Sequence, residues 1–191
     1  MGVDFSTFAG TFRFAKELGR RVPVLHVALL NVGVCMPDFR TGPDGYEISL
    51  QVTVLSTVIL ALQTLPMLRQ APAADDSFTP HLCLTNGRAF LGLVEYDMPT
   101  DQTLIERINV PFQFVGRRQY DFVNLASFFA MLGLAERSKA EEGAKRRSYS
   151  TFYFGGPQNR ELALSSAPLV WNWKAQGDYG QTIFWFHKPN L

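Results

Sequence analysis

The sequence predicts an α/β fold, an open and doubly wound parallel sheet with helices on both faces. Three observations predict it. Helix-like and strand-like segments alternate along the chain, their connections are short, and two strand-like runs, 22–34 and 81–85, are almost continuously apolar. Strands of a parallel sheet that is covered on both faces have this composition, because neither face meets water.

The first helix and the first strand are expected in the segments 4–21 and 22–34. Ser6 or Thr7 serves as the N-cap of the helix, and basic residues fill its last turn, where they interact favourably with the helix dipole. The run "VPVLHVALLNVGV" then starts with a proline after its first residue and reaches a glycine near its end, as a buried strand does.

A long second helix is expected after a loop at 35–45 that is rich in proline and glycine. Asp44 is the predicted cap of this helix, which ends at about Gln70. Its apolar stretch, 52–68, is interrupted by a glutamine and a proline and is shorter than the roughly 20 apolar residues of a membrane span. The sequence therefore predicts a buried helix of a protein that does not enter a membrane.

The remaining elements follow the second strand. A glycine-punctuated excursion at 86–118 leads to a helix that begins at about Gln119. Beyond Glu136 the pattern weakens: 137–147 is a polar helix, and "SYSTFYF" at 148–154 alternates like a strand. We interpret residues 1–191 as a single domain, with a well-patterned core at 1–136 and a divergent C-terminal part at 137–191.

Charge and cysteine content narrow the class of protein. The net charge of +1 is too small to attract nucleic acid or an anionic membrane, and the basic run 145–147 is short enough to be a solvated helix end. Cys35 and Cys83 lack metal-ligand spacing, so neither a disulfide framework nor a metal site is indicated. The N-terminus has no signal-peptide pattern. A cytoplasmic location is expected.

Four motifs follow one another along the chain, namely "ALLNVGV", "DGYEISLQVTVLSTVILALQTLPMLR", "PHLCLTNG" and "YDFVNLASFFAMLGLAE". In their order and spacing they resemble the short-chain dehydrogenase/reductase family, and especially its divergent fungal members in secondary-metabolite pathways. The resemblance covers residues 4–136 and implies a partial Rossmann-like fold.

The resemblance places Tyr120 at the family's proton-transferring tyrosine. Family members have a lysine one helical turn later, which lowers the pKa of the tyrosine and binds the nicotinamide ribose, whereas this chain has Asn124. An amide can still donate a hydrogen bond to a ribose, but it supplies no positive charge. A tyrosine without a cation beside it is only about one-thousandth phenolate at neutral pH, so general-base catalysis would be severely weakened.

Two helper positions also depart from the family pattern. A serine that polarises the substrate carbonyl usually follows the second strand, and here Asn86 and Gly87 stand there, Gly87 being the better aligned. Asn86 could donate a hydrogen bond in place of the serine, because stabilising a developing oxyanion needs a donor and not a hydroxyl in particular. The asparagine that holds the proton-relay water corresponds to Thr53.

The implied cofactor is NADP or NAD. Asp4 would reach the adenine amine, and Asn31 and Gly33 match the family's "N-A-G" motif beside the cofactor, with Val32 in place of the alanine. Tyr120 and Asn124 are the further cofactor-binding positions. Nowhere does the sequence contain the glycine-rich turn that binds the pyrophosphate, so the first strands and this loop of the family are expected to be missing.

Without those strands, the strand at 24–31 would have an unpaired, apolar edge, and such an edge promotes association. Four explanations remain open: a second copy of the chain, another protein, the chain's own segment 148–154 as a replacement strand, or an incomplete gene. We therefore expect a homo-oligomer or a partner protein at this edge.

Two functions remain open, so the sequence leaves undecided whether the chain is an enzyme. The first is an NAD(P)-dependent oxidoreductase with impaired activity that acts on a carbonyl or hydroxyl of a polyketide-like small molecule. The second is a non-redox descendant, either an interaction subunit or a binding or cyclase-like protein that uses the old substrate pocket. Aromatic side chains that could line this pocket are Phe90, Phe112, Phe114, Phe128 and Phe129.

Overall fold

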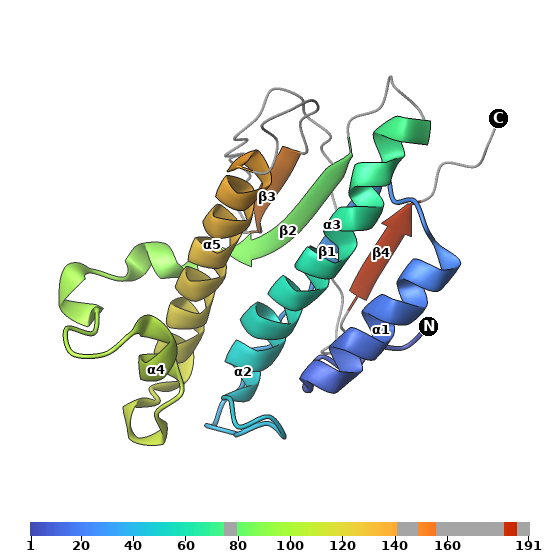
Figure 1. The fold of residues 1–191 in the computed structure, drawn as a ribbon. Coiled ribbons are helices and arrows are strands. Elements are labelled where there is room, and N and C mark those ends of the chain that lie inside the picture. Colours follow the sequence, from blue (N-terminus) through green and yellow to red (C-terminus); the bar gives the residue numbers. More distant parts are fainter. Residues whose placement is uncertain (75–79, 141–148, 156–181, 187–191) are drawn as a thin grey trace.

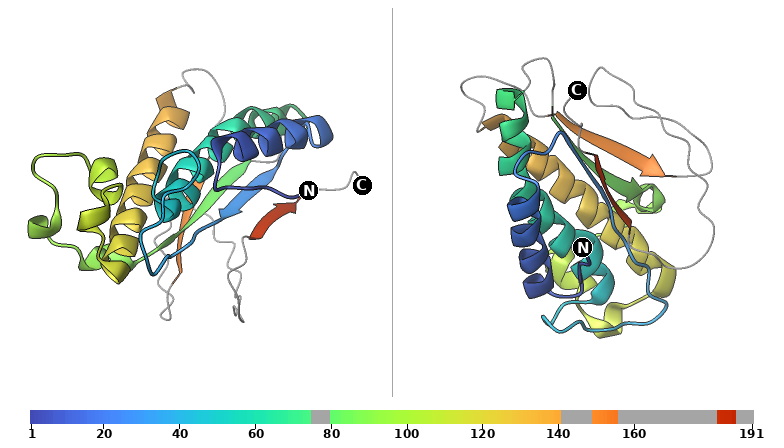
Figure 2. Two further views of the ribbon diagram at one scale, coloured as in Figure 1. Left: turned by 90° about the horizontal axis from the view of Figure 1, so that it is seen from below. Right: turned by 90° about the vertical axis from the view of Figure 1, so that its right-hand side faces the viewer.

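The computed structural model describes residues 1–74, 80–140, 149–155 and 182–186. Four strands form one sheet in the order β3-β2-β1-β4. The three long helices, α1, α3 and α5, lie side by side on one face of this sheet (Figures 1 and 2). The α/β fold with a parallel sheet is thus confirmed, and the described helices form one of the two helical layers that the sequence predicts.

The centre of the sheet is the parallel pair of β1 (Val27–Asn31) and β2 (His81–Gly87). Their register pairs Val27 with His81 and Leu30 with Leu84, so both strands end at the same edge of the sheet. Burial alternates along both strands. This alternation follows from the position of the described helices on one face: every second side chain points toward them, although the apolar runs predicted burial on both faces.

The outer strands come from the C-terminal part of the chain. β3 (Tyr149–Gly155) pairs in parallel with β2, and β4 (Thr182–Phe186) pairs antiparallel with β1. One of the four explanations left open, that 148–154 replaces the missing neighbour of the first strand, is wrong, because this segment pairs with β2 on the side away from β1. A different segment, β4, covers the edge of β1 within the same chain.

The sequence predicted the N-cap of the first helix correctly but not that of the second. Helix α1 (Phe8–Arg21) has Thr7 as its N-cap, as one of the two predicted caps. The predicted cap of the second helix, Asp44, instead accepts a hydrogen bond from the Phe8 N–H, 2.6 Å away, at the start of α1. Glu47 caps the second helix, accepting from the Leu50 N–H at 3.0 Å. A charge 36 residues away therefore stabilises the N-terminus of α1.

The second helix runs on through three segments: α2 (Ile48–Leu50), a π-helical part at Gln51–Ser56, and α3 (Thr57–Ala74). By length and composition Ile48–Ala71 could cross a membrane, but most of its apolar stretch is buried inside the protein. It is a core helix, as the sequence predicts. Helix α5 (Gly116–Ala140) extends beyond Glu136, and residues 141–148 lie outside the described part of the chain.

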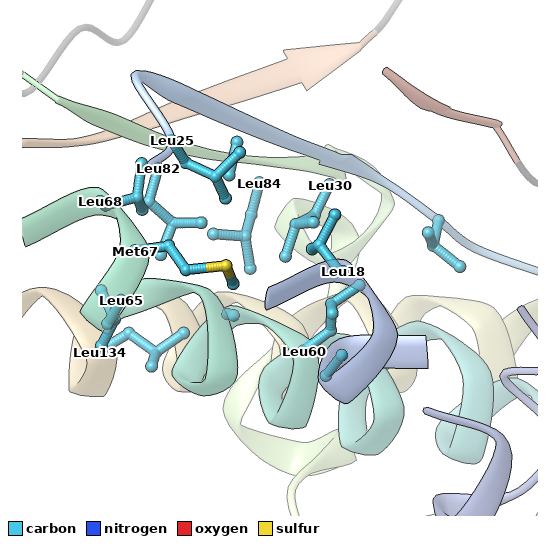
Figure 3. Packing of buried hydrophobic residues seen from close by; sticks show 14 of the residues in the cluster. Leu18, Leu25, Leu30, Leu60, Leu65, Met67, Leu68, Leu82, Leu84 and Leu134 are labelled. Atoms are coloured by element: carbon cyan, nitrogen blue, oxygen red, sulfur yellow. The ribbon is translucent and has the colours of Figure 1, made fainter. Parts of the chain in front are cut away.

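The main apolar core lies between the sheet and the helices (Figure 3). Side chains from α1, β1, α3, β2 and α5 meet there, namely Leu18, Leu30, Leu60, Leu65, Met67, Leu68, Leu82, Leu84 and Leu134. Because these contacts join all five elements, they fix the position of α5 relative to the ends of β1 and β2.

A smaller cluster attaches the excursion between β2 and α5. This excursion contains the short helical segments Ala89–Gly92, Glu95–Asp97, α4 (Leu104–Ile108) and Pro111–Gln113. Its Ile108 is buried against α5 residues such as Phe122 and Val123. The first turns of α5 are therefore held from two sides, by the sheet and by α4.

Candidate functional site

The candidate site lies at the carboxyl ends of β1 and β2, where the first turns of α5 pass. In open α/β sheets, ligands bind outside the carboxyl ends of the strands. The structure brings four of the predicted residues together here: Asn86 and Gly87 at the end of β2, and Tyr120 and Asn124 in α5. Asn31, at the end of β1, is joined to β2 by a hydrogen bond from the Thr85 hydroxyl, 2.6 Å away.

Asn124, which stands in place of the family lysine, is turned into the protein. Its side chain is buried, with 1% of its surface exposed. Its Oδ1 accepts a hydrogen bond from the Gly87 N–H at 2.9 Å, and its Nδ2 donates to the Tyr120 carbonyl at 2.7 Å. Both ends of the amide are therefore bound to backbone groups of the same protein.

Asn86, the candidate substitute for the catalytic serine, is also buried. Its Nδ2 donates to the Asn124 carbonyl oxygen at 2.9 Å, and its Oδ1 accepts from the Gly87 N–H, also at 2.9 Å. The amide thus faces helix α5 and not the space beyond the strand end. Its predicted role as a donor to a substrate oxygen remains a prediction.

Gly87 allows α5 to approach the end of β2 closely. A Cβ atom at this position would lie 2.8 Å from the Asn124 Oδ1. The serine that the family has here could not be added without moving Asn124.

Thr53, at the position of the water-holding asparagine, lies in the π-helical part of the second helix. Its hydroxyl accepts a hydrogen bond from the Val34 N–H, 3.2 Å away, and its side chain is buried. This bond fixes the loop that follows β1, close to Gly33, whose hypothetical Cβ would be 3.6 Å from the Thr53 Oγ1. Turns of π-helix are frequent at functional sites, and neither composition nor periodicity revealed this one.

The end of β1 is more open than the end of β2. Asn31 and Gly33 are both exposed, while Val32 between them is buried in the core, so its side chain points away from this surface. Asp4, the predicted adenine ligand, lies just before α1, where its Oδ1 accepts from the Ser6 N–H at 2.9 Å and from the Ser6 hydroxyl at 2.6 Å.

The predicted pocket aromatics do not form one group. Phe90 and Phe128 stack, with ring centroids 5.1 Å apart, and Phe129 lies beside Phe128 at 6.1 Å. Phe114 instead packs edge-to-face against Phe39, and Phe112 is 86% exposed.

Charged groups near the site were not identified from the sequence. Asp121 follows Tyr120, and burial raises the pKa of its carboxyl group, against the lowering effect of Arg118 and Arg117. The pKa of the Cys35 thiol is raised by burial first and then by the carboxylates of Glu47 and Asp121. Asp121 therefore lies close enough to the end of β1 to act on the thiol of Cys35. Within the described ranges, no group of three or more His, Cys, Asp or Glu residues could hold a metal ion.

The residues implied for a nicotinamide cofactor fit that role unequally. Asn31 and Gly33 are exposed at the end of a parallel strand, as a cofactor-facing surface requires. Asn124 does not fit the role of a ribose ligand, since both polar atoms of its amide are already engaged. The described residues therefore lack the group that would hold the ribose beside Tyr120.

Curated proteins of similar sequence are short-chain dehydrogenases/reductases of fungi, although no family model matches the chain. The phmF protein of Phaeosphaeria nodorum and the ffsI protein of Aspergillus flavipes are each 29% identical over 140 residues, which cover 73% of this chain and 41% of theirs. The chain thus spans about two fifths of the length of these relatives.

Solved structures with a similar fold include proteins that use or bind a nicotinamide cofactor. An NADH-dependent reductase responsible for alginate metabolism has a TM-score of 0.54 at 12% identity, covering 80% of this chain and 52% of its own. The RhlG protein of Pseudomonas aeruginosa, in a complex with NADP, has a TM-score of 0.52 at 20% identity, covering 74% and 48%. By sequence the chain is similar to fungal short-chain dehydrogenases/reductases, and its fold is similar to the folds of these two solved proteins.

Proposed function

We propose that this chain is part of an NAD(P)-dependent oxidoreductase of the short-chain type, and that its proton transfer is impaired. The substrate would be a carbonyl or hydroxyl of a small, polyketide-like molecule of fungal secondary metabolism, in the cytoplasm. The relatives named above are short-chain dehydrogenases/reductases, and a solved protein of similar fold binds NADP. The polar residues at the ends of β1 and β2 support a ligand site at this edge.

One observation carries the impairment: the Asn124 amide is bound on both sides to backbone groups. An amide has no charge, so it cannot stabilise a phenolate as an ammonium group would. Turning this amide toward a ligand would also break both of these hydrogen bonds, each worth about 0.5–1.5 kcal/mol. Tyr120 therefore keeps its place in the helix but lacks the partner that a proton-transferring tyrosine needs.

A bound nicotinamide would supply or accept the hydride. This chain contributes the surface on which such a ligand would lie: the exposed side chain of Asn31 and the backbone at Gly33. The Thr85 hydroxyl holds Asn31 through its Oδ1, which leaves the Asn31 Nδ2 to donate to a ligand oxygen. Thr53 stabilises the loop next to this surface.

A non-redox binding or interaction protein is the second candidate function. It is favoured by the same closed set of hydrogen bonds around Asn124, because the donors nearest to Tyr120 are used within the protein. The Phe90–Phe128 stack beside Phe129 gives α5 an aromatic surface on which an apolar ligand or a partner protein could bind. An association of two chains or with another protein also remains our proposal.

The test is calorimetric titration of the purified chain with NADPH and NADH, after light scattering has established its oligomeric state. Micromolar binding, together with carbonyl reduction that falls at least about 100-fold in Tyr120→Phe, supports the oxidoreductase. Tyr120→Phe keeps the ring and removes only the hydroxyl. If the folded chain binds neither nucleotide and instead saturates with an apolar dye or a partner protein, the oxidoreductase is excluded and the second candidate is retained.

A further inference from the structure

We propose that residues 87 and 124 are a coupled pair. The Asn124 amide fills the space that a side chain at position 87 would occupy, and it accepts the hydrogen bond from the Gly87 N–H. The inference concerns the end of β2 and its junction with α5. It rests on packing and hydrogen bonds, and it stands whether or not the chain transfers hydride.

The first argument is steric. A Cβ atom added to Gly87 would lie 2.8 Å from the Asn124 Oδ1, 3.2 Å from its Cγ and 3.4 Å from its Nδ2. Real Cβ contacts are essentially never shorter than 3.0 Å. Gly87 is not among the glycines with a positive φ, which are Gly45 and Gly116 in the described chain. Glycine is therefore required here by the approach of Asn124 and not by the backbone conformation.

The second argument is the closed hydrogen-bond arrangement. The Gly87 N–H donates to both Asn124 Oδ1 and Asn86 Oδ1, each at 2.9 Å. Asn86 returns a bond to the Asn124 carbonyl, and Asn124 donates to the Tyr120 carbonyl one turn earlier in α5. The end of β2 and two successive turns of α5 are thus joined by side chains that are 7% and 1% exposed.

Flexible side chains elsewhere could move to relieve a close contact, but Asn124 cannot do so without loss. If its amide turned away from an added Cβ, it would release the bond to Gly87 and the bond to Tyr120 together. Because the Asn124 side chain is itself buried, its amide would lose these partners without gaining water. The short contact would therefore be relieved at a cost, either by turning this amide or by separating α5 from β2.

The pair decides what the end of β2 can offer to a ligand. A side chain at position 87, such as the hydroxyl of a serine, is compatible only with a residue at 124 that leaves this space. A lysine at 124 has donors but no acceptor, so it could not take the bond from the Gly87 N–H. Lysine at position 124 alone would thus remove the acceptor of the Gly87 N–H without providing the hydroxyl. Serine at position 87 alone would collide with Asn124.

A double-mutant cycle on the full chain tests the coupling. We expect Gly87→Ala to lower the melting temperature by roughly 5 °C in the presence of Asn124, and to have less than about half of this effect when Asn124→Ala is already present. The control is Gly133→Ala in α5, the helix that contains Asn124; no atom lies within 4 Å of a Cβ added to Gly133. It should leave the melting temperature unchanged or slightly raised. Equal effects of Gly87→Ala in the two backgrounds would overturn the proposal.

A measurement on the unmodified chain covers the case in which Asn124→Ala does not fold. The Gly87 amide should exchange its hydrogen for deuterium at least about 100-fold more slowly than in the unfolded chain, since it has two buried acceptors. Rapid exchange of this amide in the folded chain would contradict the closed arrangement.

The pair Gly87→Ser and Asn124→Lys separates this inference from the proposed function. We expect each single variant to melt below the original chain, and the double variant to melt higher than the sum of the two decreases predicts. NADPH titration of the same proteins then reads out the function. If the changes in melting temperature are not additive and no variant binds NADPH, the coupled pair is supported and the oxidoreductase is excluded. If NADPH binds and the changes in melting temperature are additive, the oxidoreductase is supported and the coupled pair is excluded.

Discussion

Two asparagines end neighbouring parallel strands, and the structure uses them in opposite ways. Asn31, at the end of β1, is exposed and has one side-chain hydrogen bond, from the Thr85 hydroxyl. Asn86, at the end of β2, is buried under α5 and is part of the closed set of bonds with Gly87 and Asn124. The difference teaches that one half of this edge keeps an exposed polar side chain, while the other half is internal structure.

The cause of the difference is what covers each strand end. Helix α5 lies across the end of β2, where the main apolar core and α4 hold it. The end of β1 is followed by a loop that Thr53 holds through the Val34 N–H, and Asn31 is exposed among the described residues. Polar groups under a helix must find partners in the protein, and polar groups at an open edge keep their capacity to bind.

The largest effect is expected from Asn124→Ala. The substitution removes the amide's hydrogen bonds to the Gly87 N–H and the Tyr120 carbonyl and leaves a small void under α5, so the free energy of unfolding should fall by about 2 kcal/mol. Asn31→Ala is the matched control at the exposed strand end, and its effect should be below about 0.5 kcal/mol. Urea unfolding measures both. Equal losses for the two variants would remove the distinction between the strand ends.

Thr53→Val should have a smaller effect. The substitution keeps the volume but removes the acceptor of the Val34 N–H, so the free energy of unfolding should fall by about 1 kcal/mol. Thr100→Val, at an exposed position, is the control and should be neutral. If guanidinium unfolding shows no loss for Thr53→Val, the loop after β1 is not fastened by this hydroxyl.

The bond between Thr85 and Asn31 should be weaker still, since its partners are accessible to water. A double-mutant cycle with Thr85→Val and Asn31→Ala should give a coupling energy of about 0.5 kcal/mol. A coupling above roughly 2 kcal/mol would mean that Asn31 is as firmly engaged as Asn124, which the comparison denies.

The smallest effect is the pH dependence of two aspartates near α5. The pKa of Asp121 is raised from its ordinary value of 3.8, chiefly by burial, so its ionisation opposes folding and stability falls as pH rises through the folded pKa. The pKa of Asp97 is lowered, first by its hydrogen bond with Arg118, so it contributes stability above pH 3.8 that is lost as pH falls through the folded pKa.

Asp121→Asn should therefore raise the melting temperature at pH 7 slightly, and Asp97→Asn should lower it slightly. Thermal unfolding between pH 3 and pH 7 measures both changes, and a common sign at pH 7 would contradict the assignment. Screening by solvent keeps both effects small.

Several elements were predictable because their signals are local. The apolar runs at 22–34 and 81–85 contain β1 and β2, and Thr7 was one of the two predicted caps of α1. The order of four motifs was enough to place Tyr120 in α5 beside the strand ends. Apolar periodicity and capping depend on residues a few positions apart, so the sequence alone carries them.

Long-range pairing could not be read in the same way. Asp44 has the composition of a cap for the helix that follows it, yet it accepts from the Phe8 N–H, far back in the chain. The segment 148–154 was correctly expected to be a strand, but its alternation says nothing about which neighbour it joins. Similarly, β4 lies in a part of the chain without a clear period.

The sequence by itself determined the fold class, the family resemblance and the loss of a cation at position 124. Only the tertiary structure decided that Asn124 points inward, that it takes the Gly87 N–H, and that β4 pairs with β1. The physical reason is that residue identity sets which bonds a side chain can form. Which partner it receives depends on how α5 packs against the end of β2, and that packing is the sum of contacts from the whole core.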